Sequence, residues 1–64
     1  MLKKNDRVVY KYLFGDALGY PHLDGRTGTV RETADRGTLV FVRFDYSPAQ
    51  IVCYDTELTK IGED

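Results

Sequence analysis

The sequence predicts an all-β fold, a small antiparallel barrel, from three observations. Short runs rich in β-branched and aromatic residues are separated by turn residues, apolar side chains recur at every second position in these runs, and no segment keeps helical spacing. The chain has 64 residues, which predicts one domain over residues 1–64. A domain of this size buries only ~60% of the surface that its unfolded chain exposes. It therefore has little room for both a core and a deep catalytic cleft.

Five segments have the composition of strands. They are Asp6–Leu13, Gly28–Thr33, Thr38–Phe44, Gln50–Tyr54 and, after a short turn, Thr59–Ile61. Hairpin loops are expected at Ala34–Gly37, where Gly37 suits a left-handed position, and at Asp45–Ala49, where Pro48 bars a continuous strand. The first connection, Phe14–Asp24, is long, and long loops in compact domains are often functional.

Alternation along these strands predicts the side chains that fill the core. The inward set is Val8, Tyr10, Val30, Val40, Val42, Phe44, Ile51, Cys53, Leu58 and Ile61. The stretch "DGRTGTV" leads into a strand rather than a helix, so a phosphate-binding loop is not expected there. Instead, Gly25 is expected in a turn conformation and Gly28 at a close approach of two backbones.

Four motifs spread along the chain resemble SH3-like barrels, in particular the KOW type. "NDRVVY" is similar to the opening strand, with Asn5 in place of the usual glycine, and "DGRTGTV" is similar to the KOW turn and strand. "VFVRFD" resembles the third strand, and "YDTELTKI" resembles the closing turn and last strand, with Leu58 and Ile61 as apolar anchors. The resemblance implies a five-stranded antiparallel SH3-like barrel, and it implies RNA as a ligand of the KOW type.

Two weaker similarities point to other members of the same fold. "AQIVCYDTEL" is similar to the Gln-Ile-Tyr region of type II dihydrofolate reductase, an enzyme that builds one active site from four chains. Val52 stands where that family has its tyrosine. "VRFDYS" and "TEL" resemble the later strands of photosystem I reaction-centre subunit IV, which would imply docking of an electron carrier.

The sequence offers no catalytic constellation. Cys53 lies among apolar strand residues, which favours a buried side chain over a nucleophile, and His22 has no second ligand at zinc spacing. We therefore expect a chain that is not an enzyme and has no cofactor and no metal. A single cysteine, no long apolar run and no signal-peptide pattern favour a cytoplasmic location away from membranes.

Two binding hypotheses remain, and the first is preferred. A protein partner, or a second copy of the chain, would contact exposed aromatic and apolar side chains: Phe14, Tyr20, Leu39, Phe41 and Tyr46. A nucleic acid would instead contact Lys11, Arg31 and Arg43 on the outward face of the first three strands. The net charge of −1 favours protein, because long-range attraction to phosphate is weak.

Overall fold

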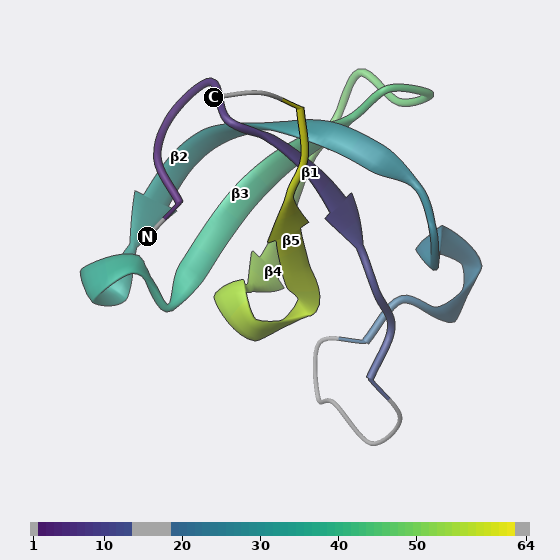
Figure 1. The fold of residues 1–64 in the computed structure, drawn as a ribbon, viewed down its shortest axis with the longest axis horizontal. Helices are drawn as coiled ribbons and strands as arrows, with labels where there is room; N and C mark the ends of the chain where they lie inside the picture. Colours follow the sequence, from purple (N-terminus) through teal and green to yellow (C-terminus); the bar gives the residue numbers. More distant parts are fainter. Residues whose placement is uncertain (1, 14–18, 63–64) are drawn as a thin grey trace.

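The computed structural model describes residues 2–13 and 19–62 and shows five antiparallel strands (Figure 1). The strands are β1 (Arg7–Tyr10), β2 (Thr27–Ala34), β3 (Leu39–Phe44), β4 (Gln50–Tyr54) and β5 (Leu58–Lys60). Short 3₁₀ turns occur at η1 (Pro21–Leu23), η2 (Asp35–Gly37) and η3 (Asp55–Glu57). The all-β prediction with five antiparallel strands is confirmed, and residues 2–13 and 19–62 form no α-helix.

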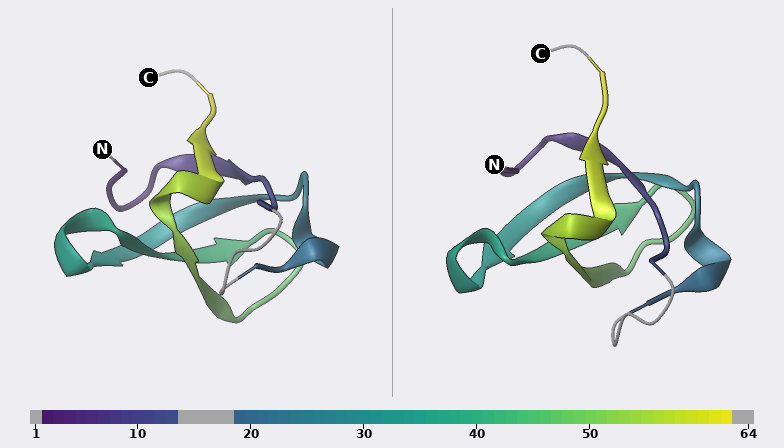
Figure 2. Two further views of the ribbon diagram at one scale, coloured as in Figure 1. Left: turned by 90° about the horizontal axis from the view of Figure 1, so that it is seen from below. Right: turned by 60° about the horizontal axis from the view of Figure 1, so that its bottom comes forward.

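The strands are arranged in the order β4-β3-β2-β1-β5. The two edge strands, β4 and β5, follow each other directly in sequence through η3. Figure 2 shows how the sheet curls, with β5 crossing over β1 while β2 and β3 bend beneath them. No ladder joins β4 to β5 in the described part of the chain, so the sheet is open and closure into a barrel stays a prediction.

Two local features of β2 let the sheet bend. The register of β2 on β3 shifts between Val30 and Glu32, so Arg31 occupies a β-bulge, which sequence alternation does not reveal. Gly28 pairs with both Val8 and Phe44, and a Cβ atom added to it would lie 2.8 Å from the Arg43 carbonyl oxygen. The predicted close approach at Gly28 is confirmed. Gly25 has φ +83°, so the predicted turn conformation is also confirmed.

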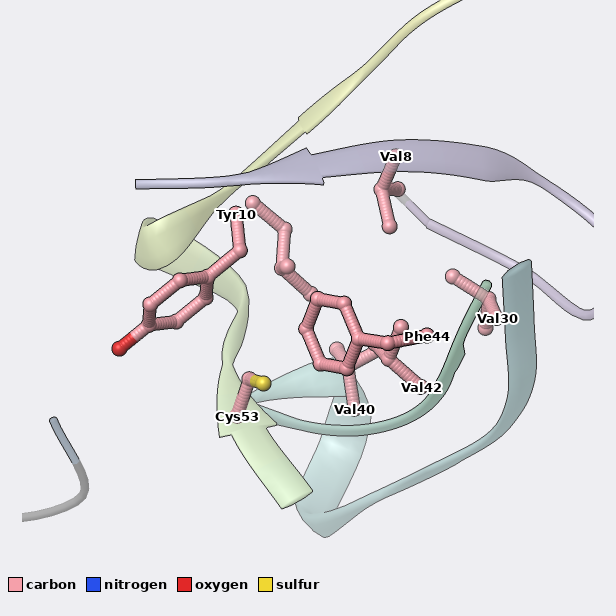
Figure 3. Close-up of a cluster of buried hydrophobic side chains, with 8 residues drawn as sticks. Val8, Tyr10, Val30, Val40, Val42, Phe44 and Cys53 are labelled. Carbon is pink, nitrogen blue, oxygen red and sulfur yellow. The ribbon is translucent and has the colours of Figure 1, made fainter. Parts of the chain in front are cut away.

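The core lies on the concave face of the sheet (Figure 3). Eight of the ten predicted inward residues are buried: Val8, Tyr10, Val30, Val40, Val42, Phe44, Cys53 and Leu58. Ile51 is half-buried and packs against this cluster, whereas Ile61 is half-buried and lines a surface groove. Ile61 lies outside the core because β5 ends at Lys60, one residue before it.

A buried carboxylate joins β1, β4 and η3. Glu57 is 1% exposed, and its Oε2 accepts a hydrogen bond from the Tyr10 hydroxyl at 3.2 Å. Its Oε1 accepts the backbone N–H of Tyr54 at 2.9 Å. The Tyr10 hydroxyl, which points away from the apolar cluster in Figure 3, also accepts the backbone N–H of Tyr20 at 2.9 Å. These bonds satisfy polar groups that would be costly to bury alone, and they fix the turn between the two edge strands.

We expect Gly28→Ala to destabilise the fold by about 1–3 kcal/mol, the usual cost of overpacking. The added methyl group would meet backbone atoms of Arg43 and Phe44, which cannot move without disturbing the ladder between β2 and β3. Urea unfolding followed by circular dichroism measures the loss. Gly25→Ala is the comparison, because its Cβ would meet no atom within 4 Å and its cost comes only from φ +83°. Wild-type stability of Gly28→Ala would contradict the close approach.

Candidate binding surface

The predicted interface residues Leu39 and Phe41 lie half-buried on the outer face of the sheet, opposite the core. Leu39 pairs with Tyr54 and Phe41 pairs with Val52, and directly paired residues share a face. Leu39, Phe41, Val52 and Tyr54 therefore form an apolar strip on β3 and β4, called here the outer strip. None of the four belongs to the buried core or to the side chains packed against it. Sequence alternation identified Leu39 and Phe41, but Val52 and Tyr54 join them only through the register.

Tyr20, another predicted interface residue, closes one end of the core instead. Its ring packs against the core cluster, with its centroid 6.1 Å from that of Tyr10. Its hydroxyl donates a hydrogen bond to the Val52 carbonyl oxygen at 2.9 Å, and burial raises its pKa. The side chain is thus held by its own chain at both its ring and its hydroxyl, and its role at an interface stays a prediction.

Two hydrogen bonds, from Tyr20 and to Glu57, cover part of the edge of the sheet at β4. The Val52 carbonyl oxygen accepts from Tyr20, and the Tyr54 N–H donates to Glu57. Edge strands offer unpaired backbone groups to any added strand, and proteins block them with such covers. Two of the groups that a further strand would need on β4 are therefore already occupied.

The remaining predicted interface residues do not join the outer strip. Tyr46 is 73% exposed in the turn after β3, where the Arg26 guanidinium lies 4.6 Å from its ring centroid. Tyr46 lies five residues beyond Phe41, at the opposite end of β3 from Leu39. Phe14 lies outside the described residues. The long connection is described from Gly19 onward, where η1 follows Tyr20.

The three cations predicted to bind nucleic acid are all exposed, but only two of them lie close together. Arg31 sits in the bulge of β2, two residues from Thr29, which pairs with Arg43. Lys11 lies at the other end of β1, where its N–H bonds the Glu57 carbonyl oxygen. Lys11 is four residues after Arg7 along an extended chain, which places the two backbones roughly 13 Å apart. Arg7 pairs with Thr29, so Lys11 lies well away from Arg31 and Arg43.

A basic groove missed at the sequence level lies between the N-terminal turn and the end of β5. It encloses about 450 Å³ and is lined by Lys3, Asn5, Asp6, Arg7, Lys60, Ile61 and Gly62. Among the described residues that line it, the one acid is Asp6, which accepts the Lys3 backbone N–H at 3.0 Å and lies 3.7 Å from the Lys60 ammonium. The sequence signal for this groove is the excess of cations over acids in residues 1–31. The groove itself could not be predicted, because only the pairing of β1 with β5 brings Lys60 beside these cations.

Arg7 is bound on the outer face by a carboxylate from the turn after β3. Its guanidinium donates to both Asp45 oxygens, at 2.8 and 2.9 Å, and to the Thr29 hydroxyl at 3.0 Å. The Thr27 hydroxyl donates to Asp45 at 2.6 Å. The hydrogen bonds from Arg7, then that from Thr27, hold the pKa of Asp45 well below its ordinary value of 3.8. This cluster joins three strands at the basic side of the sheet.

Cys53 and His22, which the sequence offers as a nucleophile and a metal ligand, lie in different surroundings. Cys53 is buried, as predicted, and burial raises its pKa to about 12, so at neutral pH it is a protonated thiol. His22 is exposed and stands edge-on to Tyr20. Over residues 2–13 and 19–62 no three His, Cys, Asp or Glu side chains are grouped to hold a metal, and no helix is long and apolar enough to cross a membrane.

We expect the ion pair of Arg7 with Asp45 to make stability depend on pH. The pKa of Asp45 is lower in the folded chain than its ordinary value of 3.8. The ion pair therefore contributes fully to the free energy of unfolding above about pH 4, and this contribution is lost as the pH falls further. Asp45→Asn should be less stable than the wild type at pH 7 and should lose less stability between pH 4 and pH 2. Urea midpoints across this range measure the difference. Asp55→Asn is the exposed control, and identical pH profiles for Asp45→Asn and the wild type would contradict the assignment.

No protein-family model, no curated protein and no solved structure matches this chain.

Proposed function

We propose that the chain is a non-catalytic binding module with an SH3-like barrel fold, and that it docks on a protein through the outer strip. One observation carries the proposal: four apolar side chains from two adjacent strands meet on the face of the sheet opposite the core. Apolar side chains gathered on an outer face are typical of interaction sites. The strand order supports the barrel, since two edge strands that are consecutive in sequence are well placed to close a curled sheet.

The proposed mode of binding is face-on. Strand addition at β4 would have to displace the Tyr20 hydroxyl from Val52 and the Glu57 carboxylate from Tyr54. Strand addition at β5 would have only the three residues Leu58–Lys60 to pair with. The aromatic ring of Phe41, within the strip, is instead the kind of anchor that dominates binding energy at protein interfaces.

A second candidate function, KOW-type nucleic-acid binding, is favoured by the basic groove. Lys3, Arg7 and Lys60 line it. Arg43 lies two strands from Arg7, across Thr29, and Arg31 lies two residues from Thr29 along β2. Two acids, Asp6 and Asp45, offset this charge in part. None of the described residues that line the groove is aromatic, so the contact we propose there is with phosphates rather than with stacked bases.

We expect Phe41→Ser to weaken the capture of a protein partner. Immobilised wild-type chain is used to retain proteins from a lysate, and a retained protein is then purified and titrated directly. Loss of a central aromatic anchor should weaken that binding at least tenfold, because such residues contribute about 2 kcal/mol or more. Tyr46→Ser, which removes an exposed aromatic side chain outside the strip, should bind like the wild type. Equal binding by Phe41→Ser and the wild type would place the site elsewhere.

For the second candidate, we expect labelled single-stranded RNA to bind in a salt-dependent way. A site with about three phosphate contacts loses roughly tenfold to twentyfold in affinity for a fourfold rise in salt. Arg43→Ala and Lys60→Ala should weaken binding, while Lys11→Ala, at the far end of β1, should not. Fluorescence anisotropy at about 50 mM and about 200 mM salt measures both the salt dependence and the effect of each substitution. Absence of binding at the lower salt rejects this candidate and leaves the first one standing.

A further inference from the structure

Two polar side chains extend the outer strip along its strands. Arg43 is the next outward residue of β3 after Phe41, and it pairs with Gln50 of β4 just as Phe41 pairs with Val52. Paired residues share a face of the sheet, so the outer face carries three adjacent rows. One row holds a guanidinium and a carboxamide, and the next two rows hold the four apolar side chains of the outer strip.

The guanidinium and the carboxamide are available to a ligand. Arg43 and Gln50 are exposed, and in the part of the chain that the structure describes neither side chain makes a hydrogen bond or an ion pair. The carboxylate of Asp45 lies near Arg43, but its two oxygens already accept hydrogen bonds from Arg7 and Thr27. The row therefore offers several N–H donors beside an apolar surface.

The charges around the outer strip make this row its cationic end. On β2, Glu32 lies beside Phe41 and is preceded in the bulge by Arg31, so this border has no net charge. Beyond the other end of the strip, the turns η2 and η3 hold the exposed charges of Asp35, Arg36 and Asp55. Two acids and one cation give that end a net negative charge. An acidic group on a ligand is therefore favoured at the Arg43 end.

The spacing of the rows matches that of an extended polypeptide. Outward residues of a strand are two positions apart, so neighbouring rows lie ~6.8 Å from each other. An extended segment laid on the strip along β3 and β4 directs every second side chain toward it at the same spacing. A carboxylate opposite Arg43 then places the residue two positions away over Phe41 and the residue two further over Leu39.

We propose that the outer strip binds an extended segment of a protein partner with the pattern acid-x-apolar-x-apolar, read in either chain direction. The inference rests on the proposed function and names the chemistry of its partner. The Arg43 guanidinium and the Gln50 amide donate hydrogen bonds to the carboxylate of the segment. Its two apolar residues pack on the rows of Phe41 and Leu39.

A nucleic acid fits this surface less well. Each nucleotide brings one phosphate charge, whereas only one of the three rows carries a cation and the other two are apolar. A polypeptide is able to place one acid and two apolar residues in the order that the rows require.

The size of the contact limits its strength. Two strands ~4.8 Å apart and three rows ~6.8 Å apart cover roughly 200 Å², well below the ~800 Å² per partner of a stable complex. We therefore expect a dissociation constant on the order of 1 mM for an isolated segment. The segment alone is a weak ligand, so its selectivity for an acid is the property to measure.

The test is NMR titration of the isotope-labelled chain with synthetic peptides, blocked at both ends, up to about 5 mM. The probes are Glu-Thr-Leu-Thr-Phe and its reverse, Phe-Thr-Leu-Thr-Glu, and in matched controls lysine replaces glutamate. A second control, Thr-Glu-Leu-Thr-Phe with its reverse, keeps the composition and net charge but turns the acid away from the Arg43 row. Chemical shifts of the amides of the outer strip measure the affinity and the position of the peptide.

We expect the wild type to bind one of the acidic probes roughly fivefold more tightly than its lysine counterpart, since an exposed ion pair replaces a like-charge contact. The control with the displaced acid should also bind more weakly than that probe. Arg43→Glu should reverse the order of the glutamate and lysine peptides. Lys11→Glu, an equal change of charge at the far end of β1, should keep the wild-type order.

Equal binding of the acidic and lysine peptides overturns the inference, as does an order that Arg43→Glu leaves unchanged. Absence of binding by every probe at about 5 mM rejects it as well. Shifts of the strip caused by self-association or by RNA, without binding of the acidic probes, assign the surface to a second copy or to a nucleic acid instead. If the probes fail while a captured protein depends on Phe41, the proposed function stands and only the acidic segment is excluded.

Discussion

A sheet of five short strands can enclose a core only if it curls, and in this chain the curl depends on β2. The Arg31 bulge adds a residue to one side of the β2–β3 ladder, which bends and twists the strand locally. Gly28 lets the backbones of β2 and β3 approach more closely than a side chain would allow. The eight-residue β2 can therefore pair with β1 over its first three residues and with β3 from Gly28 to Ala34 while the strand bends between them. The concave face that results is where the valines, Tyr10 and Phe44 meet.

The curled sheet needs a second constraint at the turn that joins its edge strands, and Glu57 provides it. A buried carboxylate is costly unless its oxygens are hydrogen-bonded, and here they accept from a phenol on β1 and a backbone amide at the end of β4. The Tyr10 hydroxyl extends the chain of bonds to Tyr20, and the Tyr20 hydroxyl returns it to β4. Segments far apart in sequence are thus fixed by directional contacts rather than by apolar packing alone. This matters in a domain whose core is formed largely by valines.

Much of the fold, but less of the surface, could be predicted from the sequence. Alternation predicted the burial of Val40, Val42 and Phe44 because each follows from its own strand, and Gly25 and Gly28 were interpreted correctly from local rules. Features that depend on pairing between strands could not be predicted in this way. The outer strip needs the register of β3 on β4, and the basic groove needs β5 beside β1. Tyr20 was expected at an interface because aromatic loop residues often are, and its hydrogen bond to Val52 depends on a contact across 32 residues.

The position of Tyr20 has a consequence for solubility. Val52 lies in a β-branched, apolar stretch of an edge strand, and its carbonyl oxygen is occupied by one phenolic hydroxyl. Exposed edge strands of this composition are the templates on which separate chains stack into cross-β fibrils. The Tyr20 hydroxyl therefore covers one backbone group of this edge, beside the Glu57 carboxylate that covers another, while the Tyr20 ring closes the core. A change of Tyr20 to phenylalanine would keep an aromatic ring at the end of the core. It would remove the hydroxyl and so leave the Val52 carbonyl oxygen without this hydrogen bond.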